Sequence, residues 1–270
     1  MTNTPIINKM SERLLSVAAL VTPGNRTADI GTDHGYVPVY LVENGIVTSA
    51  IAMDVRKGPL ARAQETVTGA ELSDRIELRL SDGFEKLKPG EADTAVIAGM
   101  GGMLICHILT AHPETTASLQ ELVLEPQSEV DKVRRLVSEI GFTITDERMI
   151  FEDGKYYPII KAEKRPFSSA AHNEMEEHTE PPSPAAHNEM EGHIEPSSPA
   201  VLSEMEVHFG PVLLRRRDPI LRKYLAWQIQ VNEQIAGRLA AAGSGNSMKR
   251  LQEVKEELRL LLAAYSRYEM

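Results

Sequence analysis

The stretch Ala28–Tyr36, Ala-Asp-Ile-Gly-Thr-Asp-His-Gly-Tyr, constrains the fold of this chain more than any other. The short apolar run before Gly31 predicts a buried strand, and Gly31 and Gly35 allow a tight turn in which the backbone approaches a ligand closely. Asp29 and Asp33 bring two carboxylates to the same strand end. Nucleotide-type ligands bind where a first strand leads into a first helix of a doubly wound sheet.

The two carboxylates indicate the charge of that ligand. They would repel a bound pyrophosphate and attract an ammonium or sulfonium group. S-adenosylmethionine carries both of these groups, whereas a dehydrogenase would have to place a pyrophosphate beside Gly31. We therefore favour S-adenosylmethionine as the cofactor.

Acids also follow the next two predicted strands. Asp54 ends a strand about twenty residues further on, which is the spacing of a carboxylate that accepts hydrogen bonds from ribose hydroxyls. Asp82 and Gly83 follow the third strand, where Asp82 would accept from an adenine amino group and the backbone of Gly83 would approach the ring. Asp and Gly often do no more than end strands, so each signal is weak alone.

The fourth predicted strand runs into Gly99-Met100-Gly101-Gly102. Four successive strands thus end in Gly or an acid, and the carboxyl ends of parallel strands meet at one edge of a sheet. This order favours a ligand site over a set of unrelated strand ends.

The order of predicted elements indicates the fold class. Strands and helices alternate, and two strands joined at Asp153-Gly154 close the series, which predicts a mostly parallel sheet with an antiparallel last strand. That is the layout of a Rossmann-like methyltransferase, because a nicotinamide-binding domain lacks the closing hairpin. The predicted elements are helix 9–21, strand 27–31, helix 36–44, strand 49–54, helix 58–69, strand 75–80, strand 93–98, helix 101–111, strand 119–124, helix 129–140, and strands 142–150 and 156–162.

Composition excludes several classes of protein. A single cysteine, Cys106, excludes a disulfide framework and a Cys-based metal site. We find no apolar run of membrane-spanning length and no signal-peptide pattern, so we expect a cytoplasmic protein without membrane contact. The net charge is −10, but residues 211–270 carry 11 Lys and Arg against six Asp and Glu. The C-terminal part is therefore the one suited to a polyanion.

Residues 165–210 interrupt the pattern. The segment Ala170–Glu176 recurs as Ala185–Glu191, and Ser203–His208 is a degenerate third copy. Pro, Ser and Glu dominate and few residues are apolar, so we predict a disordered linker. Five of the eight histidines lie here, but duplication explains their number and no scaffold brings them together, so we predict no metal site.

The remaining residues, 211–270, predict two helices. Asp218 and Pro219 form a helix start, and the glycines of 243–246 end that helix. Apolar residues at helical spacing predict an antiparallel hairpin with a coiled-coil seam. The two predicted apolar faces consist of Ile220, Tyr224, Trp227, Val231, Ile235 and Leu239, and of Leu251, Val254, Leu258, Leu261, Tyr265 and Tyr268.

Basic residues lie near the starts of both predicted helices. A solvated basic face and an RNA contact explain them equally well. These residues are Arg215, Arg216, Arg217, Arg222, Lys223, Lys249 and Arg250.

Together, the motif at 28–36, the Asp54 strand end, Ala98–Gly102 and the helical hairpin resemble one family, the bacterial tRNA (adenine-22-N1)-methyltransferases of the TrmK type. The resemblance covers residues 1–164, the Rossmann-like domain, and 211–270, the hairpin. Members of that family pass from the last strand into the coiled coil without a proline-rich repeat.

The resemblance implies an enzyme that transfers a methyl group from S-adenosylmethionine to N1 of adenine 22 in the D arm of tRNA. It also implies roles for the strand-end residues. Asp54 would hold the ribose, and Asp82 and Gly83 the adenine of the cofactor. The methionine end would lie among Asp29, Gly31, Asp33, His34 and Gly35, above a floor of Gly99, Met100, Gly101 and Gly102.

The chemistry fits these residues. Adenine N1 carries a lone pair, so positioning can supply most of the rate. The Asp/Asn-Pro-Pro-aromatic run of many exocyclic-amine methyltransferases is absent after the fourth strand, where Met100 stands among glycines. Tyr36 would be a stacking platform or a core residue, and Gln127 would contact the base. His34 would be a structural cap or a proton acceptor.

Alternatives remain open at this point. Arg13 on the first helix would contact a phosphate or simply be exposed. The acceptor would otherwise be a different RNA, a protein or a small molecule, or the chain would be a non-catalytic RNA-binding protein.

Overall fold

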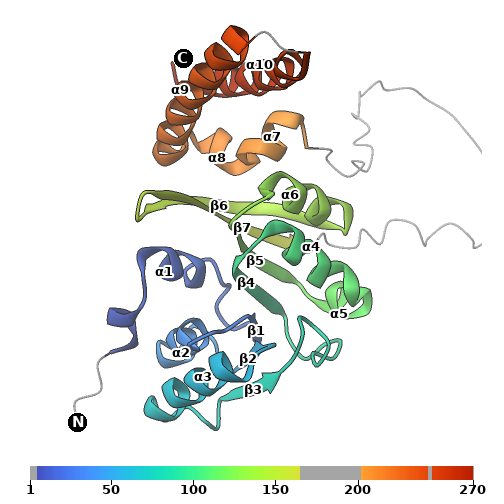
Figure 1. The fold of residues 1–270 in the computed structure, drawn as a ribbon. Coiled ribbons are helices and arrows are strands. Elements are labelled where there is room, and N and C mark those ends of the chain that lie inside the picture. Colours follow the sequence, from blue (N-terminus) through green and yellow to red (C-terminus); the bar gives the residue numbers. More distant parts are fainter. Residues whose placement is uncertain (1–4, 165–201, 243–244, 270) are drawn as a thin grey trace, which may run out of the picture.

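The computed structural model describes residues 5–164, 202–242 and 245–269 (Figure 1). One seven-stranded sheet has the order β3-β2-β1-β4-β5-β7-β6. The first five strands are parallel, and β7 pairs antiparallel with both β5 and β6. The strands are β1 (Thr27–Ile30), β2 (Ala50–Asp54), β3 (Ile76–Leu80), β4 (Thr94–Met100), β5 (Glu121–Pro126), β6 (Phe142–Glu152) and β7 (Lys155–Lys164).

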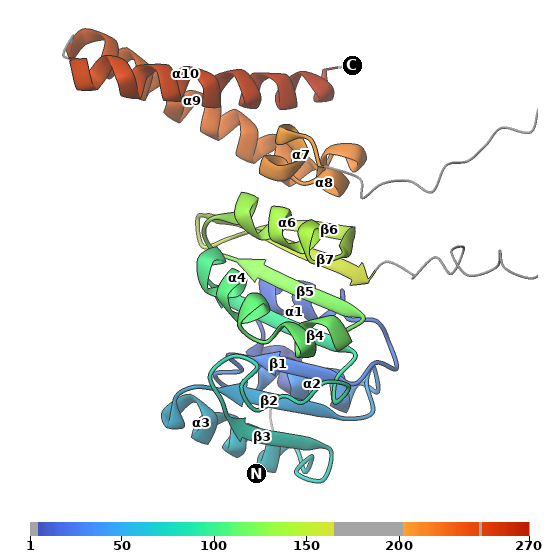
Figure 2. The ribbon, with the colours of Figure 1, turned by 90° about the vertical axis from the view of Figure 1, so that its right-hand side faces the viewer.

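Helices cover both faces of this sheet (Figure 2). Val17 of α1 and Leu41 of α2 pack with Val96 and Val123 on one face, and Ile105 of α4 and Val133 of α6 pack with strand residues on the other. The fold is therefore doubly wound, as predicted. The helices are α1 (Glu12–Ala18), α2 (Tyr36–Glu43), α3 (Lys57–Gly69), α4 (Gly102–Ala111), α5 (Pro113–Ser118) and α6 (Val130–Glu139), after a 3-10 helix at Ile6–Lys9.

The β6–β7 turn has the predicted conformation. Asp153 (φ 49°) and Gly154 (φ 76°) both lie in the left-handed region. Two such residues make the turn whose twist matches the flanking strands. The turn lets β7 fold back between β6 and β5, which completes the sheet.

The C-terminal part differs from the prediction at its start. Residues 204–209, which we assigned to the disordered linker of 165–210, form a helix. Ser203 and Glu206 cap it reciprocally, and the side chains of Val207 and Phe209 are buried. The rest of the predicted linker, 165–201, lies outside the described residues. Four helices follow one another here: α7 (Glu204–Phe209), α8 (Pro211–Arg216), α9 (Pro219–Ala242) and α10 (Gly245–Tyr265), with a last 3-10 helix at Ser266–Tyr268.

The hairpin of α9 and α10 forms as predicted, while its coiled-coil geometry stays a prediction. Asp218 caps α9 by accepting hydrogen bonds at 2.8 Å from the backbone N–H groups of Ile220 and Leu221. The predicted apolar face of α9 is wrong at Trp227 and misses Leu221 and Leu225, while Ile220 and Tyr224 are partly buried as predicted. Leu221 and Leu225 are buried there, whereas Trp227 is 48% exposed, because α9 also has to pack on β6.

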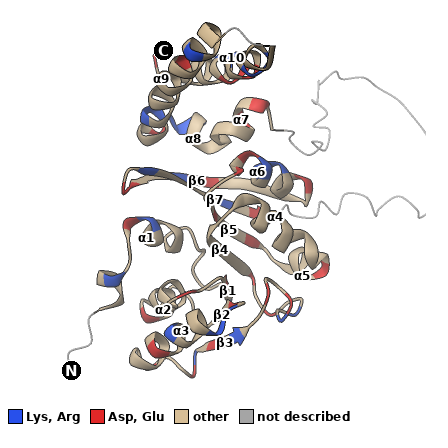
Figure 3. Ribbon diagram, in the orientation of Figure 1, with Lys and Arg blue, Asp and Glu red and all other residues tan. Residues whose placement is uncertain are grey.

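The basic residues do not form one cluster. In the antiparallel hairpin the starts of the two helices lie at opposite ends, so Arg215–Arg217 are far from Lys249 and Arg250 (Figure 2). Arg216 is ion-paired with Asp146, and Arg250 with Glu253. Lys and Arg are interspersed with Asp and Glu on these helices (Figure 3).

Candidate active site

A cavity of about 550 Å³ opens at the carboxyl ends of β1, β2 and β4. Most of the residues predicted for the site line it. Gly35, Gly101 and Gly102 do not line it, although Gly35 and Gly101 lie beside lining residues. The predicted residues on its wall are Asp29, Gly31, Asp33, His34, Tyr36, Asp54, Asp82, Gly83, Gly99, Met100 and Gln127.

Hydrogen bonds to β2 hold the loop after β1 in place. The backbone N–H groups of Gly31 and Thr32 donate to the carbonyl of Met53 at 2.8 and 2.9 Å. Gly31 has φ +77°, and a Cβ there would lie 2.3 Å from the Cε atom of Met100. Glycine adopts this φ without strain, and a larger residue would also displace the end of the Met100 side chain. The predicted proximity of the two motifs is thus a direct contact.

Gly35 shapes the site indirectly, through the conformation of the loop and the packing of α2. It starts α2 with φ +70°, and a Cβ there would lie 3.2 Å from Ala63 of α3. Its N–H donates to the carbonyl of Thr32 at 2.8 Å. Gly35 therefore closes the loop and lets two helices pack, and it does not reach the cavity wall.

Two carboxylates are buried at the cavity, Asp29 with 4% and Asp54 with 5% of its surface exposed. Burial, and to a smaller degree the nearby charge of Asp54, raises the pKa of Asp29 to about 6. Asp54 accepts a hydrogen bond from the backbone N–H of Arg56 at 2.8 Å. These groups fit a ligand that brings a cation and hydroxyl donors, as S-adenosylmethionine does.

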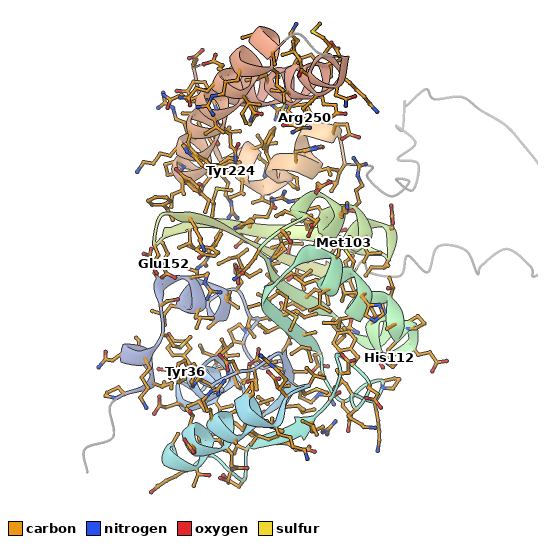
Figure 4. The ribbon with its side chains drawn as sticks, in the orientation of Figure 1. Tyr36, Met103, His112, Glu152, Tyr224 and Arg250 are labelled. Carbon is orange, nitrogen blue, oxygen red and sulfur yellow. The ribbon has the colours of Figure 1, made fainter. Side chains whose placement is uncertain are left out.

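Asp33 and His34 stand at the mouth of the cavity. The side chain of Asp33 is 53% exposed and accepts a hydrogen bond from Arg62 at 2.6 Å. The His34 ring stacks on Tyr36 with 5.1 Å between centroids and 18° between planes. Tyr36 lies at the lower left of the sheet in Figure 4, at the start of α2. This stack is a flat surface beside the cofactor loop.

The opposite wall comes from the ends of β4 and β5. The Gly99 N–H donates to the Glu125 carboxylate at 2.7 Å, and the Gln127 N–H donates to the Met100 carbonyl at 2.8 Å. Gly102 is needed for packing, because a Cβ there would lie 2.3 Å from the backbone oxygen of Ser128. These contacts hold the 99–102 loop against β5.

Sequence reasoning missed the ion pair behind this wall. Arg13 lines the cavity and donates to Glu125 at 2.6 Å, and the Glu125 side chain is fully buried. Burial raises the pKa of Glu125 although Arg13 opposes the shift. The alternative of an exposed Arg13 is therefore wrong, and its contact with a phosphate stays a prediction. The partners are 112 positions apart in the sequence, so no local signal would have found the pair.

Within the described ranges, no three His, Cys, Asp or Glu side chains are grouped to hold a metal ion. The same residues contain no helix long and apolar enough to cross a membrane.

The fold and the cavity together define a methyltransferase. Residues 10–160, more than half of the chain, match the family model described as "Methyltransferase domain". The tRNA (adenine(22)-N(1))-methyltransferase of Bacillus subtilis is 39% identical over 155 residues, which are 57% of this chain and 65% of that enzyme. This sequence match thus spans slightly less than two thirds of the relative.

Structural similarity extends over the C-terminal helices as well. The crystal structure of the B. subtilis M1A22 tRNA methyltransferase TrmK matches with a TM-score of 0.76 and 29% identity, covering 95% of this chain and 98% of that one. A Streptococcus pneumoniae "putative tRNA (m1A22) methyltransferase", solved in complex with S-adenosyl-L-methionine, matches with a TM-score of 0.71 and 28% identity, covering 95% and 99%. The chain belongs to the TrmK family of tRNA (adenine-22-N1)-methyltransferases.

Proposed function

We propose that this chain transfers a methyl group from S-adenosylmethionine to N1 of adenine 22 in the D arm of tRNA, in the cytoplasm. The observation that carries the proposal is the pair of buried carboxylates, Asp29 and Asp54, facing the Gly99–Met100 floor across one cavity. The B. subtilis and S. pneumoniae relatives support the same reaction.

The cavity residues divide between the parts of the cofactor. Asp29 and the loop at Gly31 would hold the cationic methionine end, since a buried carboxylate gains most from a cationic partner. Asp54 would accept from the ribose hydroxyls, and Asp82 with Gly83 would face the adenine. When bound, S-adenosylmethionine supplies an electrophilic methyl group on a sulfonium sulfur.

The acceptor base would approach beside Met100 and Gly99. The lone pair of adenine N1 forms the new bond to the methyl carbon while the sulfur–carbon bond breaks and its electron pair stays on sulfur. No proton has to leave N1 first, so the protein contributes mainly by positioning. The Tyr36–His34 stack and the Gln127 amide would hold the base after it leaves the RNA stack, an extraction that costs a few kcal/mol.

A tRNA substrate also needs a surface for its backbone. The exposed side chains of Arg215 and Arg217, at the corner between α8 and α9, would contact phosphates. Arg216 is less available because it is paired with Asp146.

The test is methyl transfer from radiolabelled S-adenosylmethionine to unmodified bulk tRNA, with the labelled nucleoside identified by chromatography. We expect 1-methyladenosine from the wild type and none from Asp29→Ala. Label in N6-methyladenosine, or in no tRNA nucleoside despite measurable cofactor binding, would contradict the proposal.

A further inference from the structure

A second cavity, of about 350 Å³, lies between the β6–β7 turn and α9. Its walls are Tyr156 and Tyr157 at the start of β7, Tyr224 and Trp227 on α9, and Gln127 after β5. Figure 4 labels Tyr224, which lies on α9 above the sheet. We call this cavity the aromatic groove.

The groove is built from stacked rings that solvent reaches. Tyr156 lies under the indole of Trp227, with 5.8 Å between centroids and 28° between planes. Tyr224 meets the edge of Tyr156 at 5.2 Å, and Phe151 lies 4.6 Å from the same ring. Trp227 is 48% and Phe151 50% exposed. A half-exposed indole and phenyl next to a cavity leave flat apolar surface available to a planar ligand.

The groove adjoins the methyl-transfer cavity. Gln127 lines both. A second contact also joins the two cavities. Arg13 lines the methyl-transfer cavity and Tyr157 lines the groove, and the Arg13 guanidinium lies 5.2 Å from the centre of the Tyr157 ring. A ligand with one planar group beside Gln127 in the first cavity therefore has its neighbouring group next to the aromatic groove.

We propose that the aromatic groove binds a second unpaired base of the RNA, the neighbour in sequence of the methylated adenine; this subsite rests on the proposed function. Extraction of the target base from a folded arm removes the stacking partner of its neighbour. Aromatic side chains can stack on any base, because every base has a π-face. Trp227 and Tyr156 therefore replace the lost stacking.

The charges around the groove allow a negatively charged nucleotide to bind there. Lys155 on the groove wall is exposed and can contact the phosphate that joins the two nucleotides. Glu152 at the turn is engaged by the Arg13 side chain at 3.8 Å. Asp153 in the same turn is exposed and opposes this attraction, so stacking carries the larger share of the binding.

The first experiment compares Trp227→Ala with the wild type. We expect the variant to bind an unmodified tRNA transcript roughly 5- to 150-fold more weakly, the equivalent of about 1–3 kcal/mol for one stacked base. Its affinity for S-adenosylmethionine should not change. Trp227→Phe should keep most of the RNA affinity. Leu262→Ala is the matched control, because Leu262 on α10 is 51% exposed and does not line the groove.

The second experiment uses transcripts with an abasic site on the 5′ or the 3′ side of the target adenine. We expect the wild type to lose affinity for one of them and Trp227→Ala to bind that transcript as well as the intact one. If Trp227→Ala binds intact tRNA like the wild type, or if the abasic penalty persists in it undiminished, the subsite is wrong. If the wild type methylates no tRNA at all, the proposed function fails and the subsite fails with it.

Discussion

Arg134 and Glu147 form a fully buried ion pair, with 2.9 Å between Nε and Oε1 and side-chain exposures of 1% and 0%. The pair joins the C-terminal segment to the sheet. Arg134 also donates to the carbonyls of Val207 and His208, and Glu147 accepts from the backbone N–H of Val212. These contacts hold the segment 207–212 in place on β6 and α6.

Neutralising one member of this pair should destabilise the fold strongly. In Glu147→Gln the Arg134 guanidinium stays buried without its counter-charge, and loss of one partner of a buried pair costs about 3–5 kcal/mol. Urea unfolding followed by circular dichroism measures this. Arg135→Gln is the control, because Arg135 pairs with Glu204 at the surface, and exposed pairs contribute little. Equal midpoints for Glu147→Gln and the wild type would contradict the anchoring role.

Asp29 should make the stability of the ligand-free protein depend on pH. Its pKa is raised from 3.8 to about 6, so the folded state holds this proton more tightly than the unfolded state. The protonated form therefore stabilises the fold fully below about pH 4, and that contribution is lost as the pH rises through about 6. A pKa shift of this size corresponds to a decrease of about 3 kcal/mol in the free energy of unfolding.

Asp29→Asn removes this titration. We expect the variant to gain stability over the wild type progressively across the same interval, with a constant difference above it, and to bind S-adenosylmethionine more weakly. Denaturant midpoints measured across this pH range, with Asp82→Asn as a control for loss of a carboxylate at the same cavity, test this. A difference that does not vary with pH would show that Asp29 titrates alike in both states.

Two adjacent glycines of the β4–α4 loop should respond differently to alanine. At Gly102 the new Cβ would lie 2.3 Å from the backbone oxygen of Ser128, whereas at Gly101 it would lie 3.2 Å from a Ser128 hydroxyl, which can rotate away. Gly102→Ala should cost about 1–3 kcal/mol through overpacking. Gly101→Ala should be close to neutral in thermal unfolding. The same loss in both variants would contradict this account of the loop.

The corner between α8 and α9 should contribute to the salt dependence of tRNA binding. Each phosphate contact that is removed lowers the slope of log K against log salt by roughly 0.7–0.9. We expect Arg215→Gln/Arg217→Gln to flatten the slope, measured by filter binding over a range of salt concentrations. The matched pair Lys249→Gln/Arg250→Gln probes the opposite end of the hairpin. An unchanged slope in the first double variant would exclude this corner from the RNA interface.

Local signals predicted most of the sheet and most of the cavity. Gly31 and the acids at strand ends were recognisable because a tight turn needs glycine and because the ends of parallel strands converge on one edge. Asp153-Gly154 predicted the hairpin turn for an equally local reason. The contact of Gly31 with Met100 could not be derived, since it depends on how β4 aligns with β1.

What the sequence did not show depends on distant contacts. The apolar residues Val207 and Phe209 follow a Pro- and Glu-rich stretch whose composition hid them. The buried Arg134–Glu147 pair and the apolar cluster that contains Phe209 explain why they fold. Trp227 fits the apolar period of α9 and was predicted to be buried. It is half-exposed because Leu221 and Leu225 fill the core beneath that helix, while Trp227 stacks on Tyr156 at the surface.

The most direct test of the central claim is methyl transfer to two tRNA transcripts that differ by one atom of the ring, with adenine or 1-deazaadenine at position 22. The account predicts label in the adenine transcript, recovered as 1-methyladenosine at that position, and none in the 1-deaza transcript. Equal labelling of both transcripts would show that N1 of adenine 22 is not the acceptor and would contradict the account.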